Sequence, residues 1–87
     1  MTTMTRDEIR QLVIRTLSDV APEFDFATIA ADKPLREQID IDSFDFLNVI
    51  IRLHEKLKLD IPESDYGQLA TLDGAVDYLS KKSSGNE

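Results

Sequence analysis

The sequence predicts an all-α fold: a small four-helix bundle with three main helices, a short third helix, and a long loop between the first two helices. Three observations support this prediction. Apolar residues recur at spacings of three and four in three separate segments, which is the pattern of amphipathic helices. A residue suited to capping a helix precedes each of these segments. No segment shows the strict alternation of a β-strand.

Length and composition indicate one globular domain. The chain has 87 residues, 41% hydrophobic and 31% charged, with neither Cys nor Trp. No disulfide can form, so an apolar core must stabilise the fold. We expect one domain over residues 1–82 and a disordered tail over residues 83–87. Met1 is followed by polar residues and no apolar run is long enough to span a membrane, so we expect a cytoplasmic protein.

The first helix should begin after Thr5 and end at Pro22. Thr5 and Glu8 match a capping box, and Asp7 with Glu8 suits the positive end of the helix dipole. Pro22 cannot continue the helix. The apolar stripe of this segment comprises Ile9, Leu12, Val13, Thr16/Leu17 and Val20.

Residues 22–41 show no steady period, and we expect an ordered loop there with one short helical turn. A loop of this length is unusual in a small domain and is often functional. Apolar residues spaced along it should anchor it to the core, namely Phe24, Phe26, Ile29, Leu35 and Ile39.

The second helix should run from Asp42 or Ser43 to Lys58. At about 100° per residue, one face gathers the predicted core residues. These are Phe46, Ile50, Leu53 and Leu57, with Val49 at the edge. Phe44 and Ile51 lie together on a different face. The long loop could cover them, but we favour a docking patch for a partner protein.

The sequence of the C-terminal third predicts a short helix followed by the last helix of the bundle. Ile61-Pro62 breaks the chain, and residues 63–69 could form a short helix weakened by Gly67. Thr71 can cap the last helix. Gly74 inside it costs about 1 kcal/mol relative to Ala. The apolar residues of the last helix are Leu72, Ala75, Val76 and Leu79.

The charge distribution favours basic protein partners. The net charge is -7, from 17 acidic and 10 basic residues, and residues 37–45 and 60–77 contain acids without a base. Such a surface repels nucleic-acid phosphate and anionic lipid. We therefore expect no binding to nucleic acid and no insertion into membranes.

The residue patterns of known catalytic and metal sites are missing. His54 is the only histidine and follows Ser43 by eleven residues, about 16 Å along one helix, so the two cannot form a triad. No glycine loop that could cradle a phosphate is present, and HExxH lacks its second histidine. Asp40, Asp42 and Asp45 do not match the spacing of a calcium loop. We expect neither an enzyme nor a metal site.

Ser43 is the residue that needs an explanation. As part of Asp42-Ser43 it could simply cap the helix, because either side chain can accept a hydrogen bond from the first free amides. Its setting is richer than a cap requires. The hydroxyl would be exposed at the end of a long loop, among acidic residues and without a base of its own. This combination suits a serine that another enzyme modifies.

From about Ile9 to Leu79 the sequence resembles the acyl carrier proteins. In that family an Asp-Ser-Leu step opens the second helix, an apolar run and Ile-Pro follow, and the fourth helix ends near Asp-Tyr-Ile. The corresponding elements here are Asp42-Ser43-Phe44, residues 47–57, Ile61-Pro62-Glu63 and Val76-Asp77-Tyr78-Leu79.

The resemblance implies that Ser43 is esterified by 4′-phosphopantetheine taken from coenzyme A. The thiol of this arm carries acyl groups as thioesters, and the bundle core can open to shelter an acyl chain. A phosphopantetheinyl transferase would attach the arm, and acyl-loading and acyl-processing enzymes would act on the cargo. The resemblance places Asp42 beside Ser43 in the cofactor-binding site and, with Asp45, next to the transferase. The other implied partner contacts are Phe44, Ile51 and Glu55. We expect a monomer that performs no chemistry itself.

Three departures from the family pattern predict a specialised carrier. Asp40 stands where Gly is usual, and Phe44 stands where Leu is usual. The second helix, which normally bears a line of acids, keeps only Asp45 and Glu55. Its other polar residues are Asn48, Arg52, His54, Lys56 and Lys58. We expect a carrier in fatty-acid, polyketide or lipid-related biosynthesis with its own set of partners.

Two alternatives stay open at this point. A peptidyl or aminoacyl carrier of a nonribosomal pathway would share the fold and Ser43 and differ in the adenylating enzyme that loads it. An unmodified helical interaction domain would use Ser43 only as a cap. In that case Ser43→Ala would cost about 1 kcal/mol of stability and change nothing else.

Overall fold

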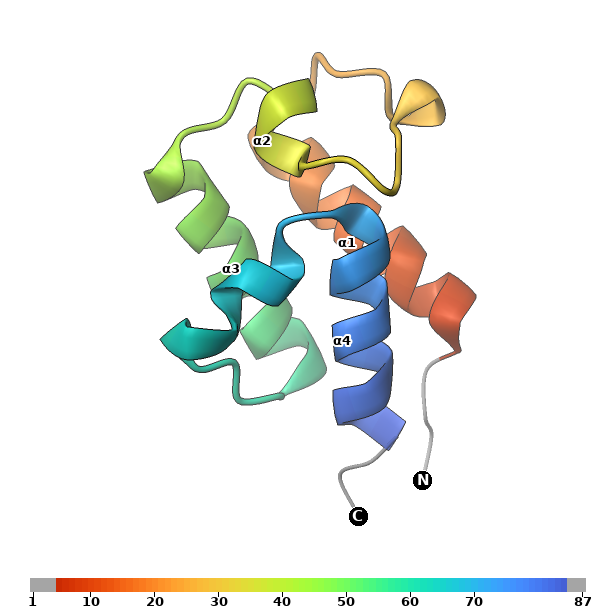
Figure 1. Ribbon diagram of the computed structural model, residues 1–87, viewed down its shortest axis with the longest axis vertical. Coiled ribbons are helices and arrows are strands. Elements are labelled where there is room, and N and C mark those ends of the chain that lie inside the picture. Colours follow the sequence, from red (N-terminus) through yellow and green to blue (C-terminus); the bar gives the residue numbers. More distant parts are fainter. Residues whose placement is uncertain (1–4, 85–87) are drawn as a thin grey trace.

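The computed structural model describes residues 5–84, with the side chains of residues 5–82, and confirms the all-α prediction for this part of the chain. Three long helices form the bundle, α1 (Arg6–Val20), α3 (Ser43–Leu57) and α4 (Leu72–Ser84). The shorter elements are η1 (Phe26–Thr28), α2 (Leu35–Gln38) and η2 (Glu63–Leu69). α1 packs against both α3 and α4, and η2 packs against α4 (Figure 1).

The capping box predicted for α1 is present. The Glu8 amide donates to the Thr5 hydroxyl at 3.1 Å, and the Thr5 amide donates to the Glu8 carboxylate at 2.8 Å. The helix ends at Val20, just before Pro22. Four residues of its inner side are buried, namely Ile9, Val13, Thr16 and Leu17. The remaining predicted stripe residues, Leu12 and Val20, are only partly buried against this core.

The segment between α1 and α3 is ordered, and it contains two helical turns, η1 and α2, where we expected one. Gln38 holds the segment together. Its side-chain nitrogen donates to the Ala30 carbonyl at 2.8 Å and its side-chain oxygen accepts from the Ala30 amide at 2.7 Å. These bonds provide partners for backbone groups of the loop, which have no partner within a regular helix.

The loop is also bonded to the junction between η2 and α4. The Leu35 amide donates to the Ala70 carbonyl at 2.7 Å, and the Asp73 amide donates to the Ala31 carbonyl at 2.9 Å. As a result the loop covers the end of the bundle where α1 ends and α3 and α4 begin (Figure 1). Of the predicted anchors, Leu35 and Ile39 are buried, while Phe24, Phe26 and Ile29 are partly buried.

The buried face of α3 is centred differently from the prediction. Ile50 and Leu53 are buried as expected, but the third buried residue is Val49, which we placed at the edge. Phe46 and Leu57 are only partly buried and pack against this core, so the buried face lies closer to Val49 than expected. The difference amounts to a rotation of the helix about its axis, which depends on how α1 packs against it.

At its C-terminal end α3 stops at Lys58, which adopts the left-handed conformation with φ of 56°. The Nδ1 atom of His54 contacts the Leu59 carbonyl, so this ring is a local partner of the helix end rather than a purely solvated side chain. This contact links the last turn of α3 to the segment that follows the helix.

The short helix η2 has the predicted bounds and is a 3-10 helix, and α4 begins after Thr71 as expected. The Gly74 amide donates to the Thr71 hydroxyl at 2.9 Å, which confirms Thr71 as a cap. A Cβ atom on residue 74 would lie 2.6 Å from the Gln68 carbonyl oxygen. Close approach of η2 therefore explains the glycine that helix propensity alone disfavours.

A side-chain hydrogen bond holds η2 beside α4. The Tyr78 hydroxyl donates to the Asp65 carboxylate at 2.6 Å. Burial raises the pKa of Tyr78 to about 12, and the hydrogen bond and negative charge of Asp65 add to this effect. The phenol is therefore kept protonated at neutral pH, as the bond to a carboxylate requires.

The backbone of α4 continues through Ser84, two residues past the expected end of the domain. The domain bounds stay a prediction. The remainder of the predicted tail, residues 85–87, lies outside the described residues.

Candidate functional site

Ser43 is the first residue of α3, and its side chain is exposed. The preceding residue, Asp42, is the N-cap, because its carboxylate accepts the Asp45 amide at 2.8 Å. The two residues thus have separate roles that sequence alone left open. Since Asp42 caps the helix, the Ser43 hydroxyl is not used for capping and projects into solvent.

Two buried isoleucines hold the backbone just before Ser43 against the core. Ile39 and Ile41 are 2% and 7% exposed, and the Ile41 amide donates to the Ile39 carbonyl at 2.8 Å. The residue between them, Asp40, is exposed. This alternation holds the start of α3 against the core while Asp40, Asp42 and Ser43 face outward.

An apolar patch lies on the exposed side of α3, and we call Phe44, Leu47 and Ile51 the outer patch. Their exposed fractions are 69%, 37% and 43%. Phe44 and Ile51 therefore lie outside the core, as predicted from their helical phase. Leu47 was missed, although its spacing of three from Phe44 and four from Ile51 places it on the same face. Whether this patch binds a partner stays a prediction.

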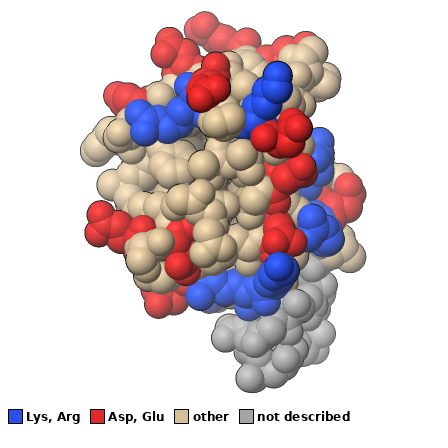
Figure 2. Space-filling view, in the orientation of Figure 1, with Lys and Arg blue, Asp and Glu red and all other residues tan. Residues whose placement is uncertain are grey.

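Acidic residues surround the serine, whereas basic residues follow along the same helix. Asp45 is half-buried beside Ser43, and Glu55 is exposed three turns further on. Arg52, between them, pairs with Asp19 of α1 at 3.4 Å. Figure 2 shows many acidic side chains at the end of the molecule that the loop covers. The surface near Ser43 is therefore negative, and that of the distal part of α3 is mixed.

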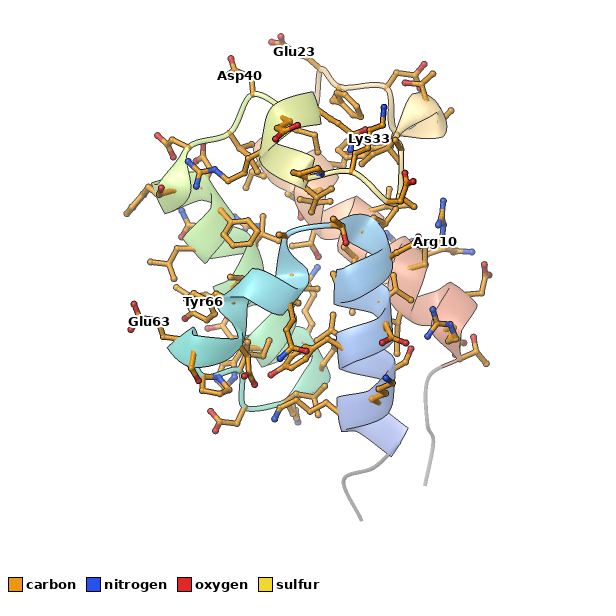
Figure 3. All side chains as sticks on the ribbon, in the orientation of Figure 1. Arg10, Glu23, Lys33, Asp40, Glu63 and Tyr66 are labelled. Carbon is orange, nitrogen blue, oxygen red and sulfur yellow. The ribbon has the colours of Figure 1, made fainter. Side chains whose placement is uncertain are left out.

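A shallow apolar hollow lies between α3, η2 and the loop. Its volume is about 250 Å³, and the residues that line it are Pro34, Arg36, Phe46, Tyr66, Gly67 and Ala70. Phe46 follows Ser43 by one helical turn, so the hollow is on the serine's side of the bundle. Tyr66 is labelled in Figure 3 on η2, beside this region.

Ser43 and His54, the pair considered for a catalytic triad, are not brought together. His54 lies at the opposite end of α3 from Ser43 and is bonded to the Leu59 carbonyl. Residues 5–84 contain no group of three or more His, Asp or Glu side chains that could hold a metal ion. Within the same range, none of the helices combines the length and the apolar character that a bilayer span requires.

Comparison with known proteins gives a consistent result. The family model for the phosphopantetheine attachment site matches residues 7–79. An acyl carrier protein of Kineococcus radiotolerans is 33% identical over 62% of this chain and 67% of its own length. One from Campylobacter hominis is 30% identical over 84% of this chain and 86% of its own, and one from Rubrobacter xylanophilus is 29% identical over 87% and 93%.

Proposed function

We propose, from the premise that this chain belongs to the acyl carrier protein family, that it carries acyl groups on a 4′-phosphopantetheine arm attached to Ser43. Members of this family are carriers and not catalysts, and phosphopantetheine is their cofactor. The observation that carries the assignment of Ser43 is local. It is an exposed serine at the first position of α3 whose neighbour Asp42 already caps the helix.

The surroundings of Ser43 suit a covalently attached arm. The hydroxyl is exposed and the outer side of the helix start is open to solvent, so no core residue must move when the oxygen forms a phosphate ester. The N-terminus of α3 presents its positive dipole end to a phosphate at this position. When bound, the arm supplies a terminal thiol, the nucleophile that a chain without cysteine lacks.

The outer patch and its acidic neighbours form the surface we assign to partner proteins. A phosphopantetheinyl transferase with a basic surface would meet Asp42 and Asp45 next to Ser43, while its apolar residues would contact Phe44 and Ile51. Glu55 extends this surface along α3. The exposed fractions of the patch support this role, because large apolar side chains at the surface of a monomer commonly mark a binding site.

The charges of α3 support a carrier with its own partners in fatty-acid, polyketide or lipid-related biosynthesis. Lys56 and Lys58 are exposed in the distal part of the helix, where a uniformly basic partner would be repelled. We expect enzymes of general fatty-acid synthesis to load and elongate acyl chains on this protein more slowly than on a housekeeping carrier. Equal rates would contradict the specialised role while leaving the carrier function intact.

The hollow beside Phe46 and Tyr66 supports a place for the cargo. This hollow is apolar and lies one helical turn from Ser43 along α3. An acyl group on the arm could therefore be shielded from water in the hollow without any opening of the core. We place the protein in the cytoplasm as a monomer, and the absence of cysteine fits a reducing compartment.

The test is an intact mass before and after incubation with coenzyme A, magnesium and a broad-specificity phosphopantetheinyl transferase. We expect a gain of one phosphopantetheine in the parent and none in Ser43→Ala. The matched control is Ser64→Ala, because Ser64 is an exposed serine on η2 and its loss should leave the gain intact. No gain in a folded parent that carries no arm would overturn the proposed function.

A further inference from the structure

A hollow separate from the one beside Phe46 lies where the end of α1 meets the segment before α3. Its volume is about 430 Å³. Its apolar lining residues are Val20, Ala21, Pro22, Phe24 and Ile39. Its polar lining residues are Glu23, Gln38 and Asp40.

The walls of this hollow are held in place by contacts within the chain. The Phe24 ring packs edge-on against Phe26 with the ring centroids 4.9 Å apart. The Gln38 side chain, which also lines the hollow, is hydrogen-bonded to both backbone groups of Ala30. Ile39 is 2% exposed, and its amide donates to the Leu35 carbonyl at 2.8 Å. The hollow is thus formed before any partner arrives, which lowers the entropy lost on binding.

The rim of the hollow is negatively charged. Glu23 and Asp40 are both exposed, none of the lining residues is basic, and neither acid takes part in an ion pair within the part of the chain that the structure describes. Figure 3 labels both side chains at the same end of the molecule, where they project away from the ribbon. The lining combines apolar side chains with two exposed carboxylates, which matches a ligand with an apolar stem and a cationic head.

We propose that this hollow, the basic-residue socket, receives an arginine or lysine side chain of a partner protein that acts at Ser43. Such side chains bury their methylene stems on apolar surface and keep the charged head in water. A guanidinium or ammonium group can also lie over the Phe24 ring. The two rim carboxylates would then pair with the cation in place of water.

The position of Asp40 connects the socket to the serine. Asp40 precedes Ser43 by three residues, and Ile41 between them is buried, so the socket wall and the start of α3 form one fixed segment. A side chain seated in the socket would orient its protein over the serine. The partner's role in this inference rests on the proposed function, whereas the recognition of a cation with an apolar stem does not.

The experiment is a titration of the unmodified chain with n-butylguanidinium, followed by the shifts of its backbone amide signals in ¹H–¹⁵N NMR spectra. We expect the largest shifts at residues 20–24 and 38–40. The double variant Glu23→Gln/Asp40→Asn should bind the probe about fivefold more weakly, which corresponds to about 1 kcal/mol. Guanidinium without the butyl stem should give much smaller shifts at these residues.

The matched control is Asp60→Asn/Glu63→Gln, which changes the net charge equally at two exposed acids outside the socket. It should bind the probe as the parent does. Equal weakening in both double variants, or shifts spread evenly over the acidic surface, would overturn the socket. Because the titration needs no arm, it separates the two proposals: a chain that gains phosphopantetheine but fails this test is a carrier without a socket, and the converse result would leave the socket and remove the carrier.

Discussion

Ile50 and Ile51 are adjacent and chemically identical, yet Ile50 is 2% exposed and Ile51 is 43% exposed. The same contrast runs along all of α3. Val49, Ile50 and Leu53 pack into the bundle, while the outer patch of Phe44, Leu47 and Ile51 faces solvent. Apolar residues of α3 thus have two roles, and the position of each residue around the helix determines which role it has. The inner face should determine stability and the outer patch should determine recognition, and each prediction below tests that division.

The largest expected effect is on the inner face. Leu53→Ala removes a side chain that is 2% exposed, and we expect it to lower the free energy of unfolding by about 2–5 kcal/mol because it leaves a cavity. Ile51→Ala is the matched change on the outer patch and should cost less than about 0.5 kcal/mol. Urea unfolding of both variants measures the difference. Similar losses in the two would show that the faces do not have separate roles.

The next effect concerns the cap at the start of α3. Asp42→Ala removes the acceptor of the Asp45 amide and should cost about 1 kcal/mol of stability. Ser43→Ala should change stability much less, because the serine hydroxyl is not the cap. Chemical denaturation of the two single variants gives the comparison. If Ser43→Ala is the more destabilised protein, the separate roles assigned to the two residues are wrong.

A smaller effect is expected for recognition by the outer patch. Phe44→Ala removes the most exposed of its apolar side chains, and we expect the KM of the phosphopantetheinyl transferase for the carrier to rise about fivefold, with stability nearly unchanged. Initial rates at saturating coenzyme A provide the measurement. Tyr66→Phe on η2 serves as a control for a conservative aromatic change away from the patch. An unchanged KM for Phe44→Ala would exclude this side chain from transferase docking.

The remaining effect is the pH dependence of stability that arises from the burial of Tyr78 and its bond to Asp65 between η2 and α4. The folded state raises the pKa of Tyr78 from 10.0 to about 12, so its contribution to stability is fully present below pH 10 and is lost as the pH rises toward 12. Tyr78→Phe should therefore lose less stability than the parent over this range. Thermal unfolding at a series of pH values tests it. A parent and variant with parallel curves would mean that folding does not raise the pKa of Tyr78.

Much of the fold and the central residue of the site follow from local sequence. The capping box at Thr5 and Glu8, the break at Pro62 and the helical spacing of the apolar residues depend on contacts within a few positions. The choice of Ser43 as the site residue follows from the ordered series of motifs around it. The resemblance to a family is what connected this series to a covalently attached arm. The helical phase of Phe44 and Ile51 also predicted their position outside the core. The two residues are seven positions apart, so they lie on one face of the helix.

Other features required the packed structure. Which of Asp42 and Ser43 caps α3 depends on the path of the chain from the buried Ile41. The exchange of Phe46 for Val49 in the core depends on how α1 lies against α3, and the need for Gly74 depends on the approach of Gln68. The socket joins residues 20–24 to residues 38–40, which no periodicity links.

The sequence by itself therefore determined where α1, α3 and η2 begin and end to within a residue or two, which serine has an unusual setting and which charges surround it, because these depend on neighbours along the chain. Only the tertiary structure decided which face each helix buries, which of Asp42 and Ser43 caps α3, and that an acidic hollow forms beside them. These depend on contacts between segments far apart in the sequence, whose geometry is fixed only when the core packs.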